Sequence, residues 1–298
     1  MKENRPRIAC VGLNVVDCYE HQGRAYPGGN EYNVSIFAAR LGAQTSFIGC
    51  FGPDFYSGAN YAFALEAGVD LSHCRFYPER CGMAVATLKD GDRVFAGGNR
   101  GGVTARHPIE LTELDLAFLR AHDITVSDRY SRMPAREFEK MHQNGVSLAY
   151  DFGDEKIDGL AQEVLPFCTY AFFSCSQRGE REIEQLVQTA FSAGCRYVLA
   201  TLGERGARAY VKAAGRPFFC AAPKLQALDT MGAGDSFLSA FLVEAATRCG
   251  LEPHTESDWT ACLEAGTQFA SKNCMYYGSI GRGLPYPVGG AEKEVERY

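Results

Sequence analysis

The chain has 298 residues, of which 46% are hydrophobic, and its 30 lysines and arginines against 36 aspartates and glutamates give a formal net charge of −6. This length and apolar content suit one large α/β domain with a small appendage. The acidic balance and the lack of a basic run argue against a nucleic-acid partner, and no stretch reaches the length of a membrane span or signal peptide.

Short apolar runs alternate along the chain with helix-like segments that stop at glycine. The runs lack strict alternation, which is typical of strands covered on both faces in a mainly parallel sheet. Repetition of strand and helix predicts a three-layer α/β/α sandwich, with ligands at the carboxyl ends of the strands. The predicted strands are Ile8–Gly12, Thr45–Cys50, Asp123–Val126, Val146–Asp151, Tyr170–Ser174, Arg196–Thr201, Ala207–Val211 and Phe218–Ala221.

Two segments interrupt this rhythm. Residues 13–26 are too short and polar for a crossover helix, and Gly82–Leu88 faces Arg93–Phe95 across an Asp90-Gly91 turn, as in a β-hairpin. We expect both to form a small β-lid, although two separate surface loops are the alternative. The main domain then takes residues 1–12, 27–80 and 103–298, and the lid takes 13–26 and 81–102. From Gly281 onward we expect a loop-like tail.

Polar residues and glycines follow the first strand. Asn14 and Asp17 lie where an open α/β sheet places its ligands, and a carboxylate there could accept two sugar hydroxyls. Gly28 and Gly29 precede a helical run that carries Asn33, so backbone amides could approach a ligand closely. Solvated loop residues and a structural turn would explain the same pattern.

A glycine-rich turn follows the strand that ends at Thr201. Gly203 and Gly206 could let this turn pass under a nucleotide. Neither a Walker phosphate loop nor a Rossmann fingerprint occurs in the chain. Taken alone, the turn is better explained as a hairpin.

The run Asp229–Asp235, directly before an apolar helical stretch, has the features of a phosphoryl-transfer site. Gly232, Ala233 and Gly234 allow a tight turn whose N–H groups point at one anion at the head of the helix. Asp235 stands in the first turn beside that anion, where a carboxylate could accept the proton of an attacking hydroxyl. The alternative is an acidic residue that merely caps a buried helix.

In order and spacing, these motifs resemble the PfkB (ribokinase-like) family of carbohydrate kinases, and within it the fructoselysine 6-kinases, over roughly residues 7–280. The resemblance implies that Asp235 is the catalytic base and that the backbone of Gly232, Ala233 and Gly234 forms the anion hole. The sugar-binding positions that it implies are Asn14, Asp17, Gly28, Gly29 and Asn33. The nucleotide positions that it implies are Thr201, Gly203, Gly206 and, in the adenine pocket, Asn273. Asp229 matches a position that binds a monovalent cation.

The resemblance therefore implies ATP-dependent phosphorylation of a hydroxyl, most simply a primary one, of a sugar or sugar-amine adduct such as fructoselysine. ATP and Mg²⁺ are the implied cofactors, with K⁺ at Asp229. Many relatives carry Asn-x-x-Glu where this chain has Ser174-Cys175-Ser176-Gln177, which leaves the organisation of Mg²⁺ open. A nucleoside kinase and a non-catalytic sugar or nucleotide sensor on the same scaffold remain alternatives.

The cysteines and the lid suggest where the protein works and how it assembles. The 12 cysteines are scattered through apolar runs without a Cys-x-x-Cys pair, so we expect reduced thiols rather than disulfides or a zinc cluster. We therefore expect a cytoplasmic protein. An exposed strand edge in the lid could pair with a second copy, which predicts a homodimer through the lid.

Overall fold

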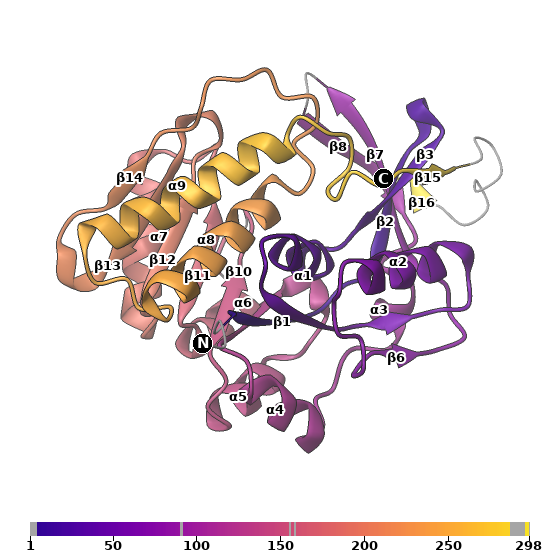
Figure 1. The fold of residues 1–298 in the computed structure, drawn as a ribbon, viewed down its shortest axis with the longest axis horizontal. Coiled ribbons are helices and arrows are strands. Elements are labelled where there is room, and N and C mark those ends of the chain that lie inside the picture. Colours follow the sequence, from indigo (N-terminus) through magenta and orange to yellow (C-terminus); the bar gives the residue numbers. More distant parts are fainter. Residues whose placement is uncertain (1–4, 90–91, 155, 158, 287–295, 298) are drawn as a thin grey trace.

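A computed structural model describes residues 5–89, 92–154, 156–157, 159–286 and 296–297, which form a large and a small β-sheet with flanking helices (Figure 1). The strands of the large sheet are β1 (Arg7–Val11), β4 (Gln44–Ile48), β9 (Ile124–Asp128), β10 (Leu148–Asp151), β11 (Tyr170–Ser174), β12 (Tyr197–Thr201), β13 (Ala207–Val211) and β14 (Phe218–Cys220). Their order is β14-β13-β12-β11-β10-β9-β1-β4, parallel except at β13 and β14. The predicted α/β fold with a mainly parallel sheet is confirmed, and all eight predicted strands lie in this sheet.

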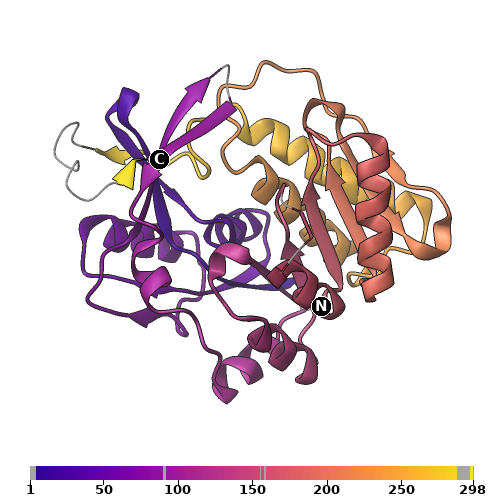
Figure 2. The same ribbon diagram turned by 180° about the vertical axis from the view of Figure 1, so that it is seen from behind.

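Helices cover both faces of the large sheet. Figure 1 looks onto the face with α1 (Asn30–Arg40), α2 (Phe55–Glu66), α8 (Ala233–Cys249) and α9 (Glu256–Asn273). Figure 2 shows the opposite face, with α4 (Glu113–Arg120), α5 (Ala135–Gln143), α6 (Gly159–Val164) and α7 (Glu180–Ala193). Side chains alternate along each strand, so Ile8 and Cys10 join the apolar core under α1 and α8, while Ala9 and Val11 join the core under α4 and α5. No helix among the described residues is long and apolar enough to cross a bilayer.

A six-stranded sheet, here called the small sheet, stands beside the carboxyl ends of the main strands. It comprises β2 (Val15–Tyr19), β3 (Arg24–Gly28), β7 (Gly82–Lys89), β8 (Asp92–Gly98), β15 (Leu284–Pro285) and β16 (Glu296–Arg297), in the order β15-β3-β2-β7-β8-β16. Strands β2 and β7 pair in parallel, so the two segments that interrupt the sandwich meet in one sheet. The Asp90-Gly91 turn predicted between β7 and β8 lies outside the described residues.

The expectation of a loop-like tail is wrong at two places. Strand β15 pairs with Arg24 and Ala25 of β3, and β16 pairs with Gly97 and Gly98 of β8. Both pairings supply hydrogen-bond partners to backbone groups on the outer edges of the small sheet. A two-residue strand is too short to show periodicity, so these strands could not be predicted from the sequence pattern.

The remaining elements are short connections. They are β5 (Cys50–Phe51) paired with β6 (Arg75–Phe76), α3 (Gly102–Arg106), and the 3-10 turns η1 (Glu20–Gln22), η2 (Arg129–Ser131), η3 (Leu165–Phe167), η4 (Gly203–Arg205) and η5 (Lys212–Ala214).

Candidate active site

The loop before α8 forms a tight turn at the head of the helix. Gly232 is its N-cap with φ 71°, and a Cβ there would lie 2.7 Å from the Cβ of Ser279. The Ala233 N–H donates to the Thr230 carbonyl at 3.1 Å and closes the turn. Within the described part of the chain, the N–H groups of Gly232 and Gly234 have no hydrogen-bond partner. Two of the three predicted anion-hole amides are therefore left for a ligand, while that of Ala233 serves the turn.

Asp235 lies in the first turn of α8, and its side chain contacts Asn33 of α1. The Asn33 Nδ2 donates to the Asp235 Oδ2 at 2.7 Å, across 202 residues of sequence. Both residues are buried. The Asn33 Oδ1 is buried without a hydrogen-bond partner among the described residues, so it is an acceptor left for a ligand hydroxyl. The structure thus brings the predicted base and a predicted sugar-binding residue together.

The predicted sugar-binding glycines are needed for close contacts. A Cβ on Gly28 would lie 2.3 Å from the Asp17 Oδ2, so Gly28 makes room for that carboxylate on the neighbouring strand β2. Gly29 is the N-cap of α1 with φ 106°, and a Cβ there would lie 2.1 Å from the Leu13 carbonyl oxygen. Gly28 and Gly29 thus form the turn between β3 and α1, where Gly28 lies against the Asp17 carboxylate and the Gly29 carbonyl accepts the Asn33 N–H at 2.8 Å.

Asn14 has a different environment. Its Nδ2 donates to the Cys50 carbonyl at 3.2 Å, and its Oδ1 accepts from the Asn60 Nδ2 at 2.7 Å. The side chain is fully buried. In this structure the Asn14 side chain links the segment between β1 and β2 to β5 and α2.

The predicted nucleotide turn connects β12 to the antiparallel strand β13. Thr201 ends β12, and the turn is closed by the Leu202 N–H, which donates to the Gly206 carbonyl at 2.7 Å. Gly203 and Gly206 have φ of 62° and 106°, and a Cβ on Gly206 would lie 2.0 Å from the Cys220 carbonyl oxygen. The turn is a hairpin, and it lies at the same edge of the sheet as the other parallel strand ends.

Asn273, which is predicted to line the adenine pocket, contacts residues 229–235 at the head of α8, here called the phosphate loop. It ends α9, and its Nδ2 donates to the Met231 carbonyl at 3.2 Å. The contact holds the backbone one residue before Gly232.

Asp229 is surrounded by hydrogen-bond donors. Its Oδ2 accepts from the Tyr19 hydroxyl at 2.7 Å and the Gly278 N–H at 2.8 Å, and its Oδ1 accepts from the Met231 N–H at 2.9 Å. The side chain is 0% exposed. Three hydrogens point at this carboxylate and would repel a cation, so the residues present fit a hydrogen-bonded carboxylate and do not fit the predicted monovalent cation.

The described residues offer no preformed metal cage. Among these residues, no group of three or more His, Cys, Asp or Glu side chains is placed so that it could hold a metal ion. Two acids that follow Ser174-Cys175-Ser176-Gln177 are engaged elsewhere, because Glu180 pairs with Arg208 and Glu182 accepts the Gly179 N–H at 2.8 Å. Mg²⁺ is commonly bound by one or two carboxylates together with the phosphates of a nucleotide. The residues present fit Mg²⁺ in this way, as an ion that binds with the nucleotide.

A buried pair of acids was missed by the sequence reasoning. Glu31 and Asp128 are 0% and 1% exposed. Burial, with the neighbouring Asp128, raises the pKa of Glu31, and burial raises the pKa of Asp128. Glu31 Oε2 accepts the Leu13 N–H at 3.1 Å, and Asp128 Oδ2 accepts from the Asn30 Nδ2 at 2.7 Å. The only local signal was an acid two residues after Gly28-Gly29, and it looks like an ordinary first-turn acid.

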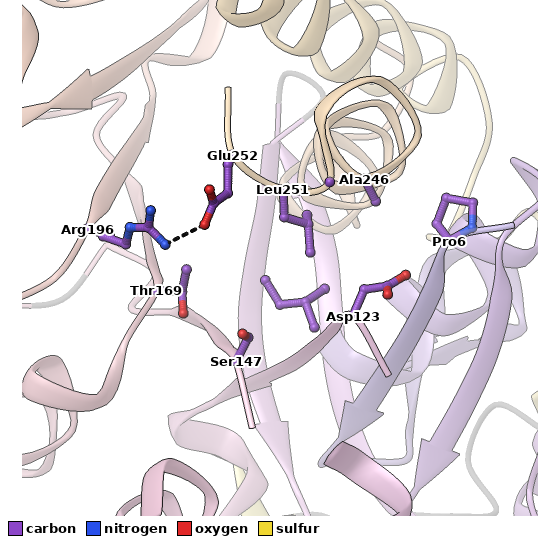
Figure 3. A pocket seen from close by; sticks show the side chains of 10 residues that line it. Pro6, Asp123, Ser147, Thr169, Arg196, Ala246, Leu251 and Glu252 are labelled. Carbon is purple, nitrogen blue, oxygen red and sulfur yellow. Dashed lines mark hydrogen bonds and ion pairs between the residues drawn. The ribbon is translucent and has the colours of Figure 1, made fainter. Parts of the chain in front are cut away.

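A surface hollow lies at the opposite, amino ends of the strands (Figure 3). Arg196 and Glu252 border it and form an ion pair at 2.8 Å. Ligands of open α/β sheets bind at the carboxyl ends of strands, so this hollow is not a candidate active site.

Known carbohydrate kinases are similar in sequence to this chain. Residues 5–285 match the model of the pfkB family of carbohydrate kinases. The chain is 34% identical to a fructosamine kinase of Bacillus subtilis, over 96% of this chain and 98% of that protein. It is 32% identical to the fructoselysine 6-kinase of Escherichia coli, over 91% and 98%.

The solved structures support the fold. The ribokinase of Arabidopsis thaliana in complex with ribose and ATP superposes with a TM-score of 0.76 at 23% identity, covering 93% of this chain and 95% of that chain. The aminoimidazole riboside kinase of Salmonella enterica superposes with a TM-score of 0.74 at 19% identity, covering 97% and 99%.

Proposed function

The chain belongs to the pfkB family of carbohydrate kinases, and from this premise we propose that it transfers the γ-phosphoryl group of ATP to a primary hydroxyl of a sugar-amine adduct of the fructoselysine class. The observation that carries the proposal is the contact of Asp235 with Asn33, next to the Gly232 and Gly234 amides that have no hydrogen-bond partner among the described residues. The substrate class rests on relatives that are more than 30% identical, among them a fructosamine kinase and a fructoselysine 6-kinase.

Asp235 is the proposed catalytic base. A carboxylate is a far weaker base than an alkoxide, so it cannot remove the proton of an alcohol before the reaction begins. The carboxylate instead orients the hydroxyl and takes its proton while the new O–P bond forms and the bond from the γ-phosphorus to ADP breaks. The Asn33 amide holds one oxygen of the carboxylate and thereby fixes its direction.

The head of α8 is the proposed anion hole. The Gly232 and Gly234 amides and the positive end of the helix dipole belong to the same first turn as Asp235, where charge would develop on the transferring phosphoryl group. One well-placed donor of this kind typically lowers a barrier by about 3 kcal/mol. Mg²⁺, when bound with ATP, neutralises phosphate charge. Thr201, Gly203 and Gly206 are the proposed nucleotide-side residues.

The small sheet is the proposed lid of the sugar site. It carries Asp17, whose carboxylate can accept two sugar hydroxyls, and the Asn33 Oδ1 can accept a third. A lid over the sugar would exclude water, which would otherwise receive the phosphoryl group.

An ADP-release assay across substrates tests the proposal. Fructoselysine, fructose, ribose and adenosine are compared at equal concentration, with ATP and Mg²⁺, and we expect turnover to be fastest with fructoselysine. Turnover on adenosine alone would support a nucleoside kinase. Thermal stabilisation by ligands without any ADP would support a sensor, and either result would overturn the proposal.

We also propose a cytoplasmic homodimer. All 12 cysteines are free thiols, as a reducing compartment allows. The dimer would form through the small sheet, where β15 and β16 cover only two residues each of the outer strands β3 and β8. Light scattering coupled to size-exclusion chromatography tests this point, and a monomer at micromolar concentration would overturn it.

A further inference from the structure

One buried hydrogen bond joins the small sheet to the phosphate loop. The Tyr19 hydroxyl, at the end of β2, donates to the Asp229 Oδ2 at 2.7 Å, and both side chains are 0% exposed. Tyr19, Tyr26 and Met231 belong to one buried apolar cluster around this bond. Water is excluded from the contact, so the bond is stronger than a surface bond of the same geometry.

The Asp229 carboxylate ties three segments together. Besides Tyr19, it accepts the Met231 N–H at 2.9 Å and the Gly278 N–H at 2.8 Å. Met231 directly precedes Gly232, whose amide is one of the two left for a ligand, and Gly278 lies in the segment that runs from α9 across to the small sheet (Figure 1). Loosening this carboxylate would therefore move the anion-hole amides.

We propose that Tyr19 is a positioning residue whose hydroxyl holds the Asp229 carboxylate in place, a role that a monovalent cation would otherwise have. Turnover therefore does not require K⁺. The inference rests on the proposed kinase function. The negative charge of Asp229 is balanced by one O–H and two N–H dipoles, and a cation that approached them would meet three hydrogens. The hydroxyl also links the strand that carries Asp17 to the loop that carries Gly232.

The wild-type protein gives the first test. ADP release is measured by chromatography, which avoids coupling enzymes, in KCl and in tetramethylammonium chloride at equal ionic strength. Equal rates are expected, and a strong requirement for K⁺ would overturn the inference. If no ADP forms in either salt with any substrate, the proposed kinase function itself fails, which is a different outcome.

Tyr19→Phe and Tyr26→Phe form a matched pair of variants. Tyr26 packs in the same cluster, but its hydroxyl donates to Gln22 at 2.9 Å. In tetramethylammonium, Tyr19→Phe should lower kcat about tenfold, the usual effect of losing one hydrogen bond to a charged group, with little change in the KM for sugar. K⁺ should partly restore its kcat, because the lost donor opens one side of the carboxylate to a cation.

Tyr26→Phe should keep the wild-type kcat in both salts. If the two variants behave alike, Tyr19 has no positioning role and the inference is wrong. Melting temperatures of both variants show whether each is folded. Should Tyr19→Phe not fold, the salt comparison on the wild-type protein still decides the question.

Discussion

The phosphate side and the sugar side of the candidate site are built differently. The proposed phosphate side is one contiguous run, residues 229–235, which offers backbone amides and one carboxylate at the head of α8. The sugar side is assembled from β2, α1 and β9, and its polar side chains are held by buried partners. We infer that substitutions on the phosphate side lower kcat, whereas those on the sugar side raise KM or alter stability.

The largest effect is expected at Asp235. Asp235→Asn keeps the size of the side chain and its contact with Asn33 but cannot take the proton of the attacking hydroxyl, so kcat should fall about 1,000-fold. Binding of the sugar, measured by calorimetry, should change little. Glu252→Gln, at the hollow on the opposite edge of the sheet, is the control and should keep full activity. A wild-type kcat for Asp235→Asn would remove Asp235 from the mechanism.

Alanine substitutions at two glycines of the phosphate loop should have different effects, one on kcat and the other on the free energy of unfolding. A Cβ on Gly234 would approach only the Phe172 ring, at an ordinary 3.6 Å, so Gly234→Ala should fold normally. A methyl group beside the Gly234 amide would crowd a phosphoryl group bound to that amide, so kcat should fall about 100-fold. Gly232→Ala should instead lose about 1–3 kcal/mol of unfolding free energy, because its φ is 71°.

Urea unfolding and ADP release, measured on both glycine variants, test this contrast. Wild-type turnover of a folded Gly234→Ala variant would mean that the phosphoryl group does not approach this amide.

The phosphate side, which is one contiguous run, could be predicted from the sequence. The sugar side, which is assembled from several elements, could be predicted only in part. A Gly-Ala-Gly run before an apolar stretch specifies its own turn, and that turn is present at Gly232. The contact of Asn33 with Asp235 spans 202 residues, and no local pattern encodes it. Likewise, Tyr19 looks like an ordinary strand residue until the fold brings it to Asp229.

The same distinction holds for the fold. The eight strands of the large sheet follow from apolar runs, and in the parallel strands burial on both faces leaves a compositional signal. The pairing of β15 and β16 with the small sheet depends on where the folded chain brings these segments. A two-residue strand is too short for its sequence to show which strand it will pair with.

A smaller effect, on KM, is expected at Asp17. Asp17→Asn should raise the KM for sugar about tenfold, because a charged acceptor of sugar hydroxyls becomes a neutral one, with kcat changed less. Asn14→Ala is the contrasting variant. Since the Asn14 amide bonds to Cys50 and Asn60 within the fold, its loss should lower the unfolding free energy by about 1–3 kcal/mol. Equal KM values for Asp17→Asn and the wild type would place the sugar elsewhere.

The smallest effect concerns stability, at the buried acids beside the sugar site. The pKa of Glu31 is raised in the folded state by burial and by Asp128, from about 4.3 in an unfolded chain. The folded protein therefore keeps a proton that the unfolded chain has released. The free energy of unfolding should fall as pH rises from about 4.3 through the raised pKa.

Glu31→Gln should remove this pH dependence. Its amide carbonyl can accept the Leu13 N–H and its NH₂ can donate to Asp128, so the variant should gain stability relative to the wild type as pH rises. Urea unfolding between about pH 5 and pH 8 measures the difference. Glu137→Gln is the contrast, because the equally buried Glu137 accepts from Lys140 at 3.0 Å, and losing that pair should destabilise the fold. If the difference in unfolding free energy between Glu31→Gln and the wild type stays constant across this pH range, Glu31 and Asp128 share no proton. The sugar side would then be held by hydrogen bonds alone.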